Sequence, residues 1–118
     1  MRLLSADSLV GTDVVNPQGE NLGNIKAIML DIETGQIAYA VLDFGGFLGL
    51  GNKLFALPWR GFTVNTGREE IVLDIPKERL ENAEGFDKDD WPDMADPNFA
   101  RRIHTFYGYE PYWETAVE

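Results

Sequence analysis

The sequence predicts a mainly β protein, a small closed or partly open β-barrel with a short helix and a helical, aromatic-rich C-terminal extension. The first 75 residues contain short apolar runs at regular spacing, with turn residues between them, which is typical of a barrel or a sandwich. Five or six strands in so short a stretch close more readily into one small barrel than into two sheets. After Ile75 the composition changes, and acidic residues and then aromatic residues dominate.

The first two strands are expected at Leu9 to Val15 and at Leu22 to Leu30. Between them, Asn16 to Gly19 has the Asn, Pro and Gly order of a type I turn. Gly23 lies inside the second strand and indicates a bulge or a close approach of another backbone. Asp31 to Gly35 then closes a hairpin, with a glycine suited to a positive φ.

The third strand is expected from Gln36 to Phe44, where both faces are apolar because Ile37, Tyr39 and Val41 alternate with Ala38, Ala40 and Leu42. Such a strand fills a small barrel on one side and is covered by another element on the other. Lys53 to Leu57 forms the fourth strand, which Pro58 ends. A last hairpin joins Phe62–Asn65 to Glu70–Asp74.

The C-terminal part carries helix signals in two places. Pro76 begins a short helix over Lys77 to Asn82, and Gly85 stops it. Asp96 is an N-cap before a proline, and the next helix ends at Gly108. One face of that helix carries apolar side chains at helical spacing: Phe99, Ile103, Phe106 and Tyr107.

These signals divide the chain into a β domain, residues 1–80, and an acidic C-terminal extension, residues 81–118. The extension is dense in aromatic residues, including Tyr107, Tyr112 and Trp113, and each ring buries roughly 150–250 Å² when packed. We therefore expect its helix and tail to pack on the barrel or on a partner subunit, and we count these three residues as candidate interaction residues.

Composition excludes several classes of function. The chain has 118 residues, no cysteine and a formal net charge of −10. Disulfides and thiolate metal sites are therefore excluded. The negative charge repels a nucleic-acid backbone, and the few basic residues are scattered, so we expect no nucleic-acid partner. The sequence has no signal-peptide pattern and no apolar run of membrane-spanning length, so we expect a cytoplasmic protein.

The glycine-rich stretch after Phe44 carries apolar residues where a loop is normally polar. Its glycine order does not match a phosphate-binding loop, and it joins two strands instead of feeding a helix N-terminus. We therefore interpret Phe47, Leu48 and Leu50 as a contact patch at a hairpin tip. The cover of this patch is either the aromatic tail or a second subunit.

No set of residues converges on catalysis. His104 is the only histidine, and the only serines, Ser5 and Ser8, lie near the N-terminus, so a nucleophilic triad is not expected. The acidic stretch matches an EF-hand at Asp87 and Asp89 and then fails at Trp91, leaving an irregular cation site as an alternative. We expect no catalytic residue, no cofactor and no metal.

The first 80 residues resemble the PRC-barrel domain, named for the photosynthetic reaction centre H subunit. The resemblance covers roughly residues 5 to 80, and its clearest parts are the runs Ala38 to Val41 and Leu54 to Trp59. The extension is similar to that of small stand-alone bacterial members that resemble the cytoplasmic domain of the H subunit. The resemblance implies a small β-barrel used as an interaction and assembly module, with no shared catalytic residues.

Taken together, the residues and the resemblance predict a non-enzymatic interaction module that forms a homodimer or a higher homo-oligomer and docks a protein partner. Two alternatives stay open. One is a module that binds an ion or a small ligand, and the other is an accessory protein of an electron-transfer complex, by analogy with the reaction centre subunit.

Overall fold

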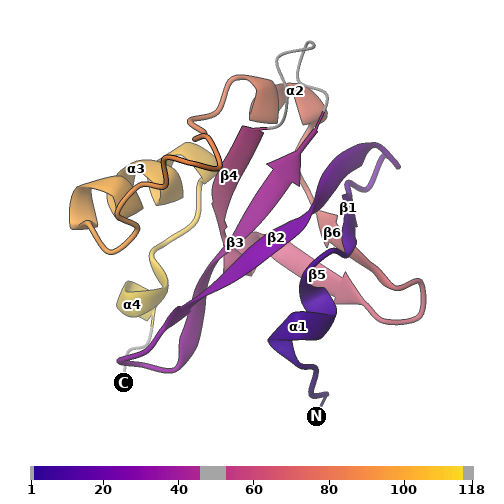
Figure 1. Ribbon diagram of the computed structural model, residues 1–118, viewed down its shortest axis with the longest axis horizontal. Coiled ribbons are helices and arrows are strands. Elements are labelled where there is room, and N and C mark those ends of the chain that lie inside the picture. The colour runs from indigo at the N-terminus through magenta and orange to yellow at the C-terminus, as the bar shows by residue number, and fades with distance from the viewer. Residues whose placement is uncertain (1, 46–52, 116–118) are drawn as a thin grey trace.

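A single six-stranded sheet forms the body of the molecule in the computed structural model, which describes residues 2–45 and 53–115. The strand order is β4-β3-β2-β1-β6-β5 (Figure 1). Every neighbouring pair is antiparallel except β1 and β6. The strands are β1 (Asp13–Val15), β2 (Asn21–Asp31), β3 (Gln36–Phe44), β4 (Lys53–Pro58), β5 (Phe62–Asn65) and β6 (Glu70–Leu73).

The sheet curls into a half-barrel that ends at β4 and β5, which do not pair with each other within the described ranges. The prediction of a mainly β protein with a small barrel is therefore confirmed, in its partly open form. The outer edge of β4 is covered at one point by the extension. There Leu54 and Phe86 form a two-bond bridge, with N···O distances of 3.0 and 2.8 Å.

Four helices and one 3₁₀ turn complete the described structure. They are α1 (Ala6–Leu9), η1 (Trp59–Gly61), α2 (Lys77–Glu81), α3 (Pro97–Tyr107) and α4 (Tyr112–Thr115). Figure 1 shows α3 beside β4, and α4 near the hairpin end of β2 and β3. In the part of the chain that the structure covers, no helix has the length and apolar character needed to cross a membrane.

The turn chemistry of the sequence is confirmed in the first half of the sheet. The N–H of Gly19 donates to the carbonyl of Asn16 at 2.9 Å, which closes the turn between β1 and β2. Gly35 has a φ of 79° at the end of the β2–β3 turn. The predicted start of the first strand was wrong, because Leu9 ends helix α1. Ser5 caps that helix by accepting a hydrogen bond from the N–H of Ser8 at 3.2 Å.

Two apolar cores lie on opposite sides of β3. Ala40 and Leu42 belong to the core inside the half-barrel. Ala38 and Tyr39 belong to a second core, which α3 completes with Phe99 and Ile103. The predicted alternation of β3 breaks at Ala38. Met29 pairs with Tyr39 and Leu30 pairs with Ile37, so Ala38 is an extra residue that has no partner in β2 and forms a bulge.

Helix α3 begins and ends where the sequence indicates. The carboxylate of Asp96 accepts a hydrogen bond from the N–H of Asn98 at 2.9 Å, and Pro97 opens the first turn. Gly108 closes the helix in the left-handed conformation, and its N–H donates to the carbonyl of His104 at 2.8 Å. These caps fix the length of the helix and so determine where the chain leaves it toward α4.

Candidate functional site

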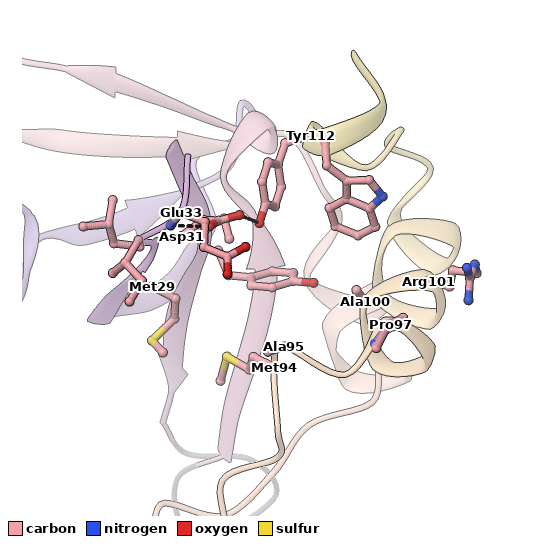
Figure 2. A pocket seen from close by; sticks show the side chains of 14 residues that line it. Met29, Asp31, Glu33, Met94, Ala95, Pro97, Ala100, Arg101 and Tyr112 are labelled. Atoms are coloured by element: carbon pink, nitrogen blue, oxygen red, sulfur yellow. Dashed lines mark hydrogen bonds between the residues drawn. The ribbon is translucent and has the colours of Figure 1, made fainter. Parts of the chain in front are cut away.

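A groove of about 550 Å³ lies between the β2–β3 hairpin and the segment from Met94 to Trp113 (Figure 2). We call it the hairpin groove. Its walls are mainly apolar, with Met29 from β2, Ala38 and Tyr39 from β3, and Ala100 from α3. Figure 2 shows Met29 and Met94 extending toward the same end of the groove. Methionine side chains adapt their shape to what they contact.

The rim of the hairpin groove carries large apolar side chains that face solvent. Ile32 is 87% exposed, Leu30 is 55% exposed and Trp113 is 42% exposed. All three belong to the residues that line the groove. Single exposed apolar residues are common on protein surfaces, but a group of them around one depression makes the hairpin groove the candidate interaction site.

A hydrogen bond holds the tail against the hairpin. The hydroxyl of Tyr112 donates to the Asp31 carboxylate, whose other oxygen accepts from the N–H of Glu33 at 3.0 Å (Figure 2). These bonds, with that of Tyr112 first, hold the pKa of Asp31 below its usual value. Burial, and next the hydrogen bond to Asp31, raises the pKa of Tyr112. Near neutral pH the contact therefore joins a charged carboxylate to a protonated phenol.

Aromatic rings form the inner end of the wall that the extension provides. His104 is 2% exposed, and its Nδ1 lies 2.8 Å from the carbonyl oxygen of Ala100, so this nitrogen carries the proton and donates. The His104 ring lies 5.6 Å from the ring of Tyr39 and 5.5 Å from that of Trp113, measured between centroids. The hydroxyls of Ser5 and Ser8 bond each other at α1, whereas the His104 ring contacts Ala100, Tyr39 and Trp113.

Tyr39 brings a buried polar atom to the groove. Its side chain is 2% exposed, and its hydroxyl oxygen has no hydrogen-bond partner among the described residues. Burial raises the pKa of Tyr39 to about 12. The hydroxyl of Tyr107 is also buried without a partner in the described part of the chain, and burial raises its pKa as well.

The candidate interaction residues of the sequence fall in three places. Phe47, Leu48 and Leu50 lie outside the described residues. Tyr112 and Trp113 line the hairpin groove. Tyr107 lies between the two apolar cores and contacts both.

Sequence reasoning missed the two hairpin residues of the rim, Leu30 and Ile32. A signal for one of them was present in the sequence. Ile32 is an apolar residue in the turn from Asp31 to Gly35, where polar residues are usual.

The acidic stretch holds no collected set of metal ligands. Among residues 2–45 and 53–115, no three Asp, Glu or His side chains gather closely enough to bind one ion. Asp87 and Asp89 line a depression together with Lys26 and Lys88, whose positive charges compete with a cation. Asp96 is used as the cap of α3.

A family model for the PRC-barrel domain matches residues 1–80. The chain belongs to the PRC-barrel family. No curated protein matches its sequence. The matched residues include all six strands, so the family accounts for the half-barrel. The second wall of the hairpin groove, from Met94 to Trp113, lies outside the match.

Proposed function

We propose that this PRC-barrel protein is a non-enzymatic assembly module that associates with a second copy of itself through the hairpin end of its sheet. A PRC-barrel domain suggests a general protein-interaction or assembly module. The observation that carries the more specific proposal is the exposure of Leu30 and Ile32 beside the hairpin groove. Covering exposed apolar surface stabilises a contact by roughly 25 cal/mol for each Å² that is buried, before the costs of association are subtracted.

The polar groups at the hairpin groove support a binding role over a chemical one. The Asp31 carboxylate is held by Tyr112 and by backbone N–H groups. His104 uses Nδ1 within its own helix. The one hydroxyl that meets a carboxylate among the residues lining the groove is that of Tyr112, and its raised pKa keeps it a protonated donor to Asp31.

Light scattering from low to high micromolar concentration tests the proposal. We expect a mass that rises from monomer toward dimer as the concentration rises. Leu30→Ser weakens the association, whereas Leu3→Ser leaves it unchanged, since Leu3 is 83% exposed and does not line the hairpin groove. A mass that stays monomeric at every concentration contradicts self-association.

A second candidate function is binding of a small aromatic alcohol or phenol in the hairpin groove. Its volume of about 550 Å³ is within the range of roughly 300–1,000 Å³ that is usual for small-molecule sites. Tyr39 lines the groove, and a small shift of the side chains around its buried hydroxyl would let such a ligand pair with it. A saturable rise in melting temperature with phenol, lost in Tyr39→Phe, supports this candidate, and no rise removes it.

A further inference from the structure

Among the described residues, the second half of strand β2 has no partner strand along one of its two backbone edges. On one side, β3 pairs with β2 as far as Asp31. On the other side, β1 pairs only with Asn21 to Asn24, and the last backbone bonds are those of Ile25 with Gly11 and Thr12. Beyond Ile25, no backbone group in the described ranges bonds this edge. Figure 1 shows the hairpin end of β2 and β3 extending past β1.

The free stretch is regular enough to accept another strand. The pairing with β3 shows an extra residue in β2 at Lys26 and an extra residue in β3 at Ala38. From Ala27 to Asp31, β2 therefore advances without an inserted residue. An uncovered regular edge is a template for strand addition, and native proteins usually protect such edges.

The side chains of this stretch fit a second copy of the same stretch. Antiparallel pairing about a two-fold axis requires one residue to lie opposite itself. With Met29 at the axis, Ile28 lies opposite Leu30 of the other copy, and both are apolar. Leu30 is exposed and Ile28 is half-buried, so the pair covers apolar surface on each side of the axis.

The charges fit the same register. Ala27 lies opposite Asp31 of the other copy, and Lys26 shares the bulged position with Ala27. Lys26 lines a depression with Asp43 and Asp87 of its own chain, and in this register it also lies on the same face as an opposing Asp31, twice in one symmetric pair. Opposite charges that face each other across two strands stabilise the pairing, whereas like charges destabilise it. This local complementarity is notable in a chain whose net charge is −10.

We propose that the edge of β2 from Ala27 to Asp31 pairs antiparallel with the same edge of a second copy, with the two Met29 residues opposite each other. The inference rests on the proposed self-association and specifies its geometry. It joins two half-barrels through one continuous sheet. The exposed Leu30 is then covered by Ile28 of the second copy.

Disulfide cross-linking tests the register. The chain has no cysteine of its own, so an introduced cysteine is the only thiol that can react. Opposed residues in an antiparallel pair have Cα atoms about 4.5–5.5 Å apart, which a disulfide spans. Met29→Cys is therefore expected to form disulfide-linked dimers under mild oxidation about tenfold faster than Ile32→Cys, because pairing raises the effective concentration of its thiol. Ile32 is far more exposed, so random collision favours the control.

A charge reversal gives an independent readout that does not need a cysteine. Lys26→Glu places like charges together twice, and we expect its dimer dissociation constant to rise about tenfold over wild type. Lys88→Glu makes the same change in net charge in the depression that Lys88 shares with Lys26, but on a segment that is not part of the β2 edge, and it is expected to change the constant less than twofold. Circular dichroism confirms that both variants are folded.

The outcomes separate this inference from the proposed function. A wild-type chain that stays monomeric overturns both. A dimer in which Met29→Cys cross-links no faster than Ile32→Cys, and in which Lys26→Glu behaves as Lys88→Glu does, overturns edge pairing and leaves self-association standing. Rapid cross-linking through Met29→Cys together with a weakened Lys26→Glu dimer supports the edge.

Discussion

Two tyrosines line opposite walls of the hairpin groove, and their hydroxyl groups differ in hydrogen bonding. The hydroxyl of Tyr112 donates to Asp31, whereas that of Tyr39 is buried without a partner among the described residues. A buried polar group that lacks a partner costs about 1–3 kcal/mol of stability. Removing each hydroxyl should therefore change the free energy of unfolding in opposite directions.

We expect Tyr39→Phe to raise the free energy of unfolding by about 1 kcal/mol, because it removes the unpaired hydroxyl and keeps the ring. The matched change Tyr112→Phe removes a bonded hydroxyl and lowers the same quantity. Urea unfolding followed by circular dichroism measures both. If Tyr39→Phe destabilises as much as Tyr112→Phe does, the Tyr39 hydroxyl has a partner, such as a water molecule.

The contact between Asp31 and Tyr112 also predicts a pH dependence. The carboxylate of Asp31 has a lowered pKa in the folded protein. Its contribution is therefore complete above the unfolded pKa, about 3.9, and is lost as the pH falls through the lower folded value. Between pH 5 and pH 2, we expect the melting temperature of wild type to fall more steeply than that of Tyr112→Phe. Parallel curves would show that the contact adds nothing.

A glycine inside β2 allows two strands to approach. The sequence indicated a bulge or a close approach at Gly23, and the close approach is confirmed. Its φ is 117°, and a Cβ placed there would lie 2.1 Å from the carbonyl oxygen of Asp43. The identity of that neighbour followed only from the register of β2 with β3, which no local pattern supplies.

Gly23→Ala is expected to destabilise the fold by more than about 2 kcal/mol, since both the positive φ and the clash with backbone must be relieved. Gly19→Ala is the matched control. Gly19 has a φ of 86° with no atom within 4 Å of the added Cβ, so only the strain of about 1–2 kcal/mol applies. Thermal unfolding of the two variants ranks the costs, and equal costs contradict the clash.

At the scale of elements, long strands and helices were predicted from their hydrophobic patterns, whereas very short helices were not. β3 runs from Gln36 to Phe44, as its continuous apolar run predicts. α3 has caps at both ends and a periodic apolar face, and it was predicted at both ends as well. Helices α1 and α4 have four residues each, too few to show a period. The hairpin groove was not predicted, because residues distant in the chain form its two walls.

The cap of α3 offers a test of how the extension is stabilised. Asp96→Ala removes the side-chain bond to the N–H of Asn98, and we expect a loss of about 1 kcal/mol in the free energy of unfolding. Asp90→Ala removes the same charge from the acidic stretch without touching a cap, and its effect is expected within about 0.5 kcal/mol. Chemical unfolding of both variants checks this. Equal losses would assign the effect to charge.

At the scale of the whole molecule, the many carboxylates among the described residues do not gather into an ion site. The net charge is −10, and no set of three ligands forms within the described residues. Added salt should therefore stabilise the fold by screening, without regard to the identity of the cation.

We expect calcium chloride and magnesium chloride to give the same melting temperature within error, and sodium chloride of equal ionic strength to come close to both. Differential scanning calorimetry makes the comparison. A rise specific to millimolar calcium would reveal a site that the described side chains do not form.

The fold class was accessible from the sequence because the apolar runs, the turns and the family motifs agree over the first 80 residues. How far the barrel closes could not be predicted from the sequence. It depends on whether β4 and β5 meet, and they are the two ends of the sheet order. Neither strand carries a local signal for that distance.

The bridge between Leu54 and Phe86 limits how far an assembly of these chains can grow. It occupies the outer edge of β4 at the position where another strand would otherwise start to add. A protein with an open edge at β2 and another at β4 would pair β2 with β2 and β4 with β4 in alternation, which builds a filament without a fixed end. The bridge at Leu54 interrupts the β4 edge, so in the proposed dimer β4 does not offer a second point of growth.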